Sequence, residues 1–313
     1  MTVFADRLAA RIVDYIQLRR SLGHVFRVQA TTLTEFQRFV AESERPGPLT
    51  TDLAVAFVLT CEVTPNVRAR RYAVLRRFAE YLVIFEPQTE ALDPHALPRL
   101  RATTPARILD DTELARLLVA ARAVVARDAL RGRTLYTLLG LLASTGLRSG
   151  EALRLDCADV DLAQGVLRIR QTKFRKDRLV PFHATTRTQL QAYATERDHA
   201  YPVRASPAFF VSLRGARLST TALGVGFRQA RTAAGLGGDQ PRELRPHDLR
   251  HRFATLRLVT WYRAGVDVQA QLPLLATYLG HVRYSDTAYY ITGTAELLGL
   301  AAERVFAPRG GAG

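Results

Sequence analysis

The pattern of apolar and polar residues predicts four helices in the first 85 residues. Apolar positions recur at helical spacing near 3–22 and 30–42, after Thr50–Thr51, and in the stretch that follows Thr64–Pro65. Threonine before a helix can cap it, and proline suits the first helical position. We therefore expect a small helical bundle at this end of the chain.

Residues 86–106 interrupt the helical pattern. Prolines recur through this stretch, at Pro87, Pro94, Pro98 and Pro105. Proline-rich segments of this kind are typical of extended linkers. The predicted organisation is therefore a helical domain over 1–88, a linker over 89–106 and a second domain over 107–313.

The second domain is predicted to be mostly α-helical with a small antiparallel β-sheet. Its first helix begins with Asp110 or Asp111 as the cap, and the next is almost wholly apolar, ends at Gly146 and should be buried. Two runs rich in β-branched residues, GVLRIRQ and DRLVPF, indicate short strands. Further helices are predicted near 185–198, 219–234, 247–263, 269–279 and 294–306.

Charge narrows the classes of partner. The net charge is +15 and the pI about 10.6. Such a surplus attracts polyanions, and nucleic acid is the first candidate because each neutralised phosphate releases counterions. No run approaches 18 apolar residues and no apolar leader is present, so we expect neither membrane insertion nor a signal peptide. Cys61 and Cys157 form no CxxC pair and are interpreted as thiols of a reducing compartment.

The two lysines stand out. Of 44 Lys and Arg residues only Lys173 and Lys176 are lysines, and both lie between the two predicted strands. Arginine stays protonated, whereas a lysine can be tuned to release a proton. We therefore expect one of them to be a general acid. An ordinary charged turn is the alternative.

Other polar residues suit phosphoryl transfer. Arg148 follows a glycine turn, His247 and Arg250 share one helix face, and His281 and Tyr290 lie near the end of the chain. Arginines and histidines can hold a phosphate and the added charge of its transition state. A tyrosine can attack phosphorus to form a covalent ester. Taken singly, histidines and tyrosines are more often core residues.

A metal site is not expected. His247 and His251 are four residues apart, a spacing that suits zinc, but the glutamate of the metalloprotease motif is replaced by Asp248. Arg250 beside these histidines would repel a cation.

In their order and spacing these residues resemble the tyrosine recombinase (phage integrase) family over about 107–306. The matching blocks are Arg148 and Glu151 in TGLR-x-GE, Lys173 in a hairpin followed by K-x-R-x-V-P, His247 and Arg250 in H-x-L-R-H, His281 in L-G-H, and Tyr290 nine residues later. The usual G-K-G before the hairpin is replaced by Gln171–Phe174, and Tyr289 adjoins Tyr290, so the register of the nucleophile stays open.

The resemblance implies a DNA breaking–rejoining fold behind a core-binding (SAM-like) helical domain. It also implies cleavage through a 3′-phosphotyrosine and a Holliday junction, with no cofactor. The partners implied are double-stranded DNA and three further copies in a synaptic homotetramer, with accessory recombinases or DNA-bending proteins left open. The implied location is the bacterial cytoplasm, at the nucleoid. We expect further DNA contacts from Arg68, Arg71, Arg175 and Lys176, although the first two also fit a solvated basic face.

Two alternative functions remain at this stage. A type IB topoisomerase shares the tyrosine and the phosphate-binding residues. A non-catalytic DNA-binding protein of the same fold would not need Tyr290 or Lys173. The sequence also leaves open whether the task is integration, excision, transposition or dimer resolution, and whether the last helix packs on its own domain or on a neighbouring copy.

Overall fold

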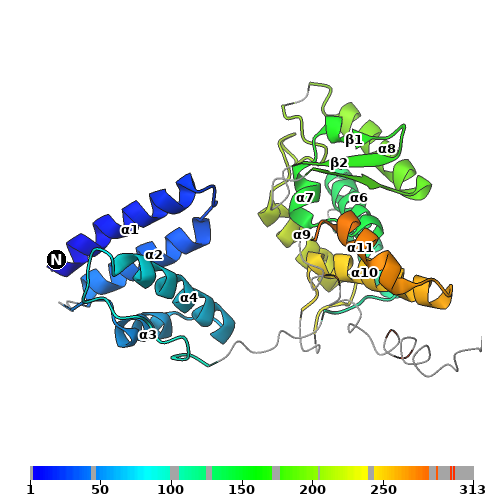
Figure 1. Cartoon of the computed structure of the whole chain (residues 1–313). Coiled ribbons are helices and arrows are strands. Elements are labelled where there is room, and N and C mark those ends of the chain that lie inside the picture. Colours follow the sequence, from blue (N-terminus) through cyan, green and yellow to red (C-terminus); the bar gives the residue numbers. More distant parts are fainter. Residues whose placement is uncertain are drawn as a thin grey trace, which may run out of the picture. The chain divides into compact units, whose positions relative to one another are not determined.

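The chain divides into two compact units, residues 1–103 and 104–313. The computed structural model describes residues 3–43, 47–98, 106–124, 129–170, 177–203, 205–238 and 243–281, together with Thr287, Leu297 and Gly299. Figure 1 shows the helices and strands of the two units. Each unit has its own hydrophobic core.

Unit 1 is built from the helices α1 (Val3–Ser21), α2 (Arg27–Glu42), α3 (Thr51–Thr60) and α4 (Pro65–Leu82). Their apolar faces meet in one core, which includes Leu8, Phe36 and Phe78. Thr50 caps α3, since its side chain accepts a hydrogen bond from the Leu53 amide at 3.3 Å. The predicted helices of this region are therefore confirmed.

The segment after α4 packs against the same unit. Leu92 is buried in the unit 1 core, and the Tyr72 hydroxyl donates to the Asp93 carbonyl at 2.8 Å. Glu90 accepts hydrogen bonds from both the amide and the hydroxyl of Thr51, each at 2.9 Å. The proline-rich stretch is thus held to the helices as far as it is described, up to residue 98.

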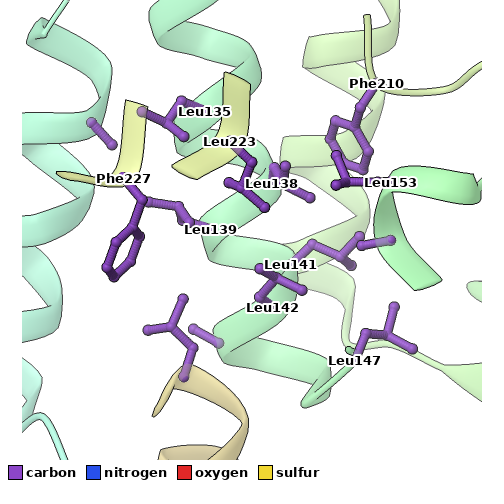
Figure 2. Close-up of a cluster of buried hydrophobic side chains, with 14 of the residues drawn as sticks. Leu135, Leu138, Leu139, Leu141, Leu142, Leu147, Leu153, Phe210, Leu223 and Phe227 are labelled. Carbon is purple, nitrogen blue, oxygen red and sulfur yellow. The ribbon is translucent and has the colours of Figure 1, made fainter. Parts of the chain in front are cut away.

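Unit 2 surrounds a buried central helix, α6 (Ala129–Thr145). Leucines of α6 pack against Leu223 and Phe227 of α9 (Thr220–Ala233) and against Leu153 of α7 (Ser149–Arg154), as Figure 2 shows. The first helix, α5 (Asp111–Ala123), begins with a capping box in which Asp110 and Glu113 each accept the other's amide. α8 (Ala184–Ala200) packs on another side of α6.

A small antiparallel sheet follows α7 and the 3₁₀ turn η1 (Cys157–Asp159). Its strands are β1 (Val160–Asp161), β2 (Val166–Ile169) and β3 (Arg178–Pro181), in that order, with Leu167 opposite Val180. The mostly helical fold with a small sheet is as predicted. Figure 1 shows the helices α10 (Pro246–Arg263) and α11 (Val268–Leu279). Their apolar side chains form a second core, which includes Leu258 and Leu272.

Candidate active site

Arg148 is placed by a tight turn at the end of α6. Gly146 has φ +63°, and a Cβ there would lie 2.5 Å from Cδ1 of Phe253, so glycine is required on both counts. Arg148 then occupies the N-cap of α7, with 33% of its side chain exposed. Its guanidinium donates to the carbonyls of Leu279 (3.4 Å) and Gly280 (3.1 Å) at the end of α11.

Glu151 is the buried acid next to this arginine. Its carboxylate accepts the amide of Arg148 at 3.1 Å and Nη1 of Arg148 at 3.0 Å. It also accepts Nη1 and Nη2 of Arg178 from β3, at 3.1 and 2.8 Å. Burial alone would raise the pKa of Glu151, but the hydrogen bonds and charge of Arg178, followed by those of Arg148, lower it to about 2. The carboxylate is therefore ionised and shared by two arginines.

Arg178 joins three elements. Besides Glu151 of α7 it reaches the carbonyl of Tyr278 in α11, which accepts its Nε at 2.9 Å. Gly280 makes room for it, because a Cβ at that position would lie 2.7 Å from Nη1 of Arg178. Arg178 is the arginine of the K-x-R-x-V-P motif, and no role was predicted for it from the sequence. Its signal was its position two residues before the buried Val180, which puts both side chains on the core-facing side of β3.

Arg250 lies in α10 and is buried, with 1% of the residue exposed. It donates to the carbonyl of Gly146 at 2.7 Å and to that of Leu279 at 2.8 Å. The helix begins with Pro246, and the buried Asp248 accepts the amide of Arg245 at 2.8 Å. Arg250 thereby links the turn before Arg148 to the end of α11.

His247 lies one turn of α10 before Arg250. The residue keeps exposed surface, but desolvation lowers its pKa to about 4, helped by the neighbouring His251 and Arg250. The rings of His247 and His251 are 4.9 Å apart and nearly perpendicular. Among the described residues, no three His, Cys, Asp or Glu side chains gather as metal ligands.

His281 follows the left-handed Gly280, which ends α11 at φ +69°. Its Nδ1 lies 2.7 Å from the hydroxyl of the buried Thr287. This contact fixes the rotation of the imidazole ring, and Thr287 was not anticipated from the sequence. The end of α11 is thus the point at which Arg148, Arg250 and His281 converge.

The remaining predicted site residues are placed as follows. Lys173, Arg175, Lys176, Tyr289 and Tyr290 lie outside the described residues. In unit 1, Arg68 donates to the carbonyl of Cys61 at 3.3 and 3.1 Å. Arg71 lies 2.6 Å from the carboxylate of Glu35 and 3.0 Å from the Cys61 sulfur. Both arginines thus have partners within unit 1, and both keep partly exposed surface.

No helix in the described part of the chain is long and apolar enough to cross a bilayer.

Comparisons with known proteins identify the family. The model of the phage integrase family matches residues 107–296. The putative integrase/recombinase y4rE of Sinorhizobium fredii is 54% identical over 312 residues, which span all of both chains. The tyrosine recombinase XerD of Caulobacter vibrioides is 32% identical over 73% of this chain and 71% of its own.

Solved structures share the fold. The integrase of the transposon Tn1549, in complex with transposon right end DNA, has a TM-score of 0.69 at 17% identity and covers 96% of this chain and 99% of its own. The XerH site-specific recombinase, bound to its difH substrate, has a TM-score of 0.66 at 20% identity over 88% and 78%. The family match over residues 107–296 and the identities to y4rE and XerD show that the chain belongs to the phage integrase family, the tyrosine recombinases, and is an enzyme of that class.

Proposed function

We propose that this chain is a site-specific DNA recombinase that uses Tyr290 as its nucleophile. The observation that carries the proposal is the convergence of Arg148, Arg250 and His281 at the end of α11. Two guanidinium groups held beside imidazoles suit the charge of a pentacoordinate phosphate, without any metal.

The proposed reaction has two balanced steps. The Tyr290 oxygen attacks phosphorus and loses its proton to solvent, the bond from phosphorus to the 5′ oxygen breaks, and that oxygen takes a proton from Lys173, which is left neutral. The product is a 3′-phosphotyrosine and a free 5′ hydroxyl. In the second step a 5′ hydroxyl from the partner DNA attacks phosphorus and gives its proton to the neutral Lys173, the bond from phosphorus to the Tyr290 oxygen breaks, and that oxygen regains a proton from solvent. The ester conserves the bond energy, so no cofactor is required.

His247, Arg148 and Arg250 would hold the phosphate oxygens, and His281 would orient the reacting group. In the free protein the pKa of His247 is lowered to about 4, and a bound phosphate would raise it again because an adjacent negative charge favours the imidazolium. Arg148 has the exposed surface that a phosphate contact needs. Arg250 already donates to the carbonyls of Gly146 and Leu279, so it would have to contact the phosphate through another of its N–H groups.

The organisation around the site follows the same proposal. Residues 1–88 would form the core-binding domain, 89–106 the linker and 107–313 the catalytic domain, with Arg68, Arg71, Arg175 and Lys176 on the DNA backbone. Four copies would hold two DNA sites together, and strand exchange between the sites would pass through a Holliday junction. The reaction would take place in the cytoplasm, at the nucleoid. A λ integrase tetramer bound to a Holliday junction shares the fold, with a TM-score of 0.63.

Covalent trapping tests the proposal. Nicked duplexes that together cover the DNA flanking the gene would be incubated with the protein. Covalent protein–DNA adducts would be separated on a denaturing gel, and the peptide linked to the DNA would be mapped. We expect an adduct at Tyr290 that disappears in Tyr290→Phe and persists in Tyr289→Phe. An adduct at Tyr289 would move the nucleophile by one residue, and no adduct on any duplex would contradict catalysis by this chain.

Relaxation of a supercoiled plasmid that lacks the cleaved site separates the topoisomerase alternative. A recombinase should leave such a plasmid supercoiled, whereas a type IB topoisomerase would relax it.

A further inference from the structure

The cluster of Arg148, Glu151 and Arg178 contains two positive charges and one negative charge. Both oxygens of the Glu151 carboxylate accept one hydrogen bond from each arginine. Glu151 has 3% of its side chain exposed and Arg178 has 10%, so both lie away from solvent. Arg148 has 33% exposed and is the member of the cluster that a ligand can reach.

This division of contacts decides how much charge Arg148 can offer to a phosphate. If the carboxylate had only Arg148 as a partner, the two would form a neutral pair, and a phosphodiester would compete with Glu151 for the same guanidinium. Such competition is strong where water is excluded, because charges interact more strongly at low dielectric. Arg178 neutralises the carboxylate of Glu151 through a bidentate pair of hydrogen bonds. The cluster therefore retains one net positive charge, that of Arg148.

Arg178 is also held where it can do this. Its Nε bonds the carbonyl of Tyr278, which directly precedes the two carbonyls that Arg148 contacts. The absence of a side chain at Gly280 leaves space for the guanidinium. Arg178 and Arg148 therefore bind the end of α11 together, with Glu151 between them.

We propose that Arg178 is a positioning residue that neutralises Glu151 so that the charge of Arg148 remains available to the scissile phosphate. The inference rests on the proposed function, because it assigns a phosphate ligand to Arg148. Arg178 itself does not touch the DNA in this proposal; it acts through Glu151.

A charge-restoring pair of variants tests the idea. The rate of adduct formation would be measured in single turnover on the nicked duplex that traps the wild-type protein. Arg178→Met leaves Glu151 paired with Arg148 alone and should slow cleavage by about tenfold or more, a part of what removing a whole donor costs. Adding Glu151→Gln removes the competing charge, so the double variant should be faster than Arg178→Met. A purely structural role predicts the opposite, since each change removes further contacts.

Two more variants complete the design. Arg178→Lys keeps the charge but cannot bridge Glu151 and Tyr278 together, and it should cleave faster than Arg178→Met. If Arg178→Met does not fold, Arg178→Lys alone can test the proposal. A cleavage rate of Arg178→Lys as low as that of Arg148→Ala would contradict the proposal that the charge of Arg178 neutralises Glu151. Arg217→Met is the matched control, since Arg217 pairs with Asp156 in the same unit and bonds the carbonyls of Leu153 and Leu155. Its cleavage rate, corrected for folded protein, should equal that of the wild type.

The outcomes separate the two proposals. A double variant no faster than folded Arg178→Met would overturn this inference and leave the recombinase proposal standing. The same holds if Arg178→Met cleaves at the wild-type rate. A wild-type protein that forms no adduct would overturn both.

Discussion

Arg148 and Arg250 donate hydrogen bonds to the same acceptor, the carbonyl oxygen of Leu279, at 3.4 and 2.8 Å. One arginine begins α7 and the other lies in α10, so the end of α11 holds both in fixed positions. Arg250 is buried and Arg148 is partly exposed, so we expect the two to differ in their effect on stability but not in their effect on catalysis.

Replacing Arg250 should cost both stability and activity. Arg250→Met leaves the buried carbonyl of Gly146 without this donor, at about 1–3 kcal/mol, and leaves the carbonyl of Leu279 with only its longer bond from Arg148. Arg148→Met should lower the free energy of unfolding less, because Arg148 is partly exposed. Both variants should slow adduct formation by about 10²- to 10³-fold. Urea denaturation and single-turnover cleavage measure the two effects, and equal losses of stability would contradict the difference in burial.

Alanine at position 280 should destabilise the protein more than a left-handed backbone alone explains. Gly280 has φ +69° and its added Cβ would meet Arg178, whereas Gly235 has φ +68° with open space around it. Both variants should lose roughly 1–2 kcal/mol from backbone strain. Gly280→Ala should lose roughly 1–3 kcal/mol more from overpacking. Thermal unfolding of the two variants side by side checks this, and equal shifts in Tm would rule out the predicted clash.

The ionised Glu151 should make stability fall in acid. Its pKa is lowered from 4.5 to about 2 in the folded protein, so its contribution is fully present above pH 4.5 and is lost as the pH falls towards 2. The contribution is on the order of 3 kcal/mol. Denaturation of the wild type and Glu151→Gln at several pH values should give curves that converge over this interval. Parallel curves would show that the carboxylate does not titrate there.

His247 should be uncharged at neutral pH in the free protein. Its pKa is lowered from 6.5 to about 4, so it disfavours the folded state progressively as the pH falls from 6.5 towards 4. A titration followed by NMR should place the midpoint near 4. His251→Gln removes one neighbouring cause and should raise that midpoint. A midpoint near 6.5 in the wild type would show that the imidazole is solvated.

Lys173 and Lys176 lie outside the described part of the chain. Their roles can nevertheless be distinguished by the cleavage rates of Lys→Arg variants. Lys173→Arg should slow cleavage although it conserves charge, because arginine is a poor proton donor. Lys176→Arg is the matched control and should cleave normally if Lys173 is the acid. A substrate with sulfur at the bridging 5′ position needs no proton on its leaving group and should restore the rate of Lys173→Arg. A fully active Lys173→Arg on ordinary DNA would contradict the general-acid role.

Much of the fold could be predicted because local signals were strong. Thr50 and Asp110 are caps, as their positions before helices indicated. α2 begins at Arg27 rather than near residue 30, because the left-handed Phe26 (φ +45°) precedes it and carries no sequence signal. The short strand β1 was missed, since two residues are too few to show an alternating pattern.

The arrangement of the candidate site could not be predicted from the sequence, which supplied only the residues to look for. The motif spacing pointed to Arg148, Arg250 and His281, and the structure brings these residues to one helix end. The burial of Arg250 and the contacts of Arg178 depend on packing between α7, β3, α10 and α11, which no single stretch of sequence encodes. The roles of Lys173 and Tyr290, and the DNA contacts, stay predictions.

The shared carboxylate of Glu151 limits where a hybrid protein between this enzyme and a relative can be joined. A hybrid joined between α7 and β3 would take Glu151 from one parent and Arg178 from the other. A parent that lacks Glu151 would leave the buried guanidinium of Arg178 without its carboxylate, at a cost of about 3–5 kcal/mol, and a parent that lacks Arg178 would leave Glu151 paired with Arg148 alone. The segment from α7 to β3, which includes η1, β1 and β2, is therefore a poor place for a crossover, and a functional exchange has to carry both residues as one unit.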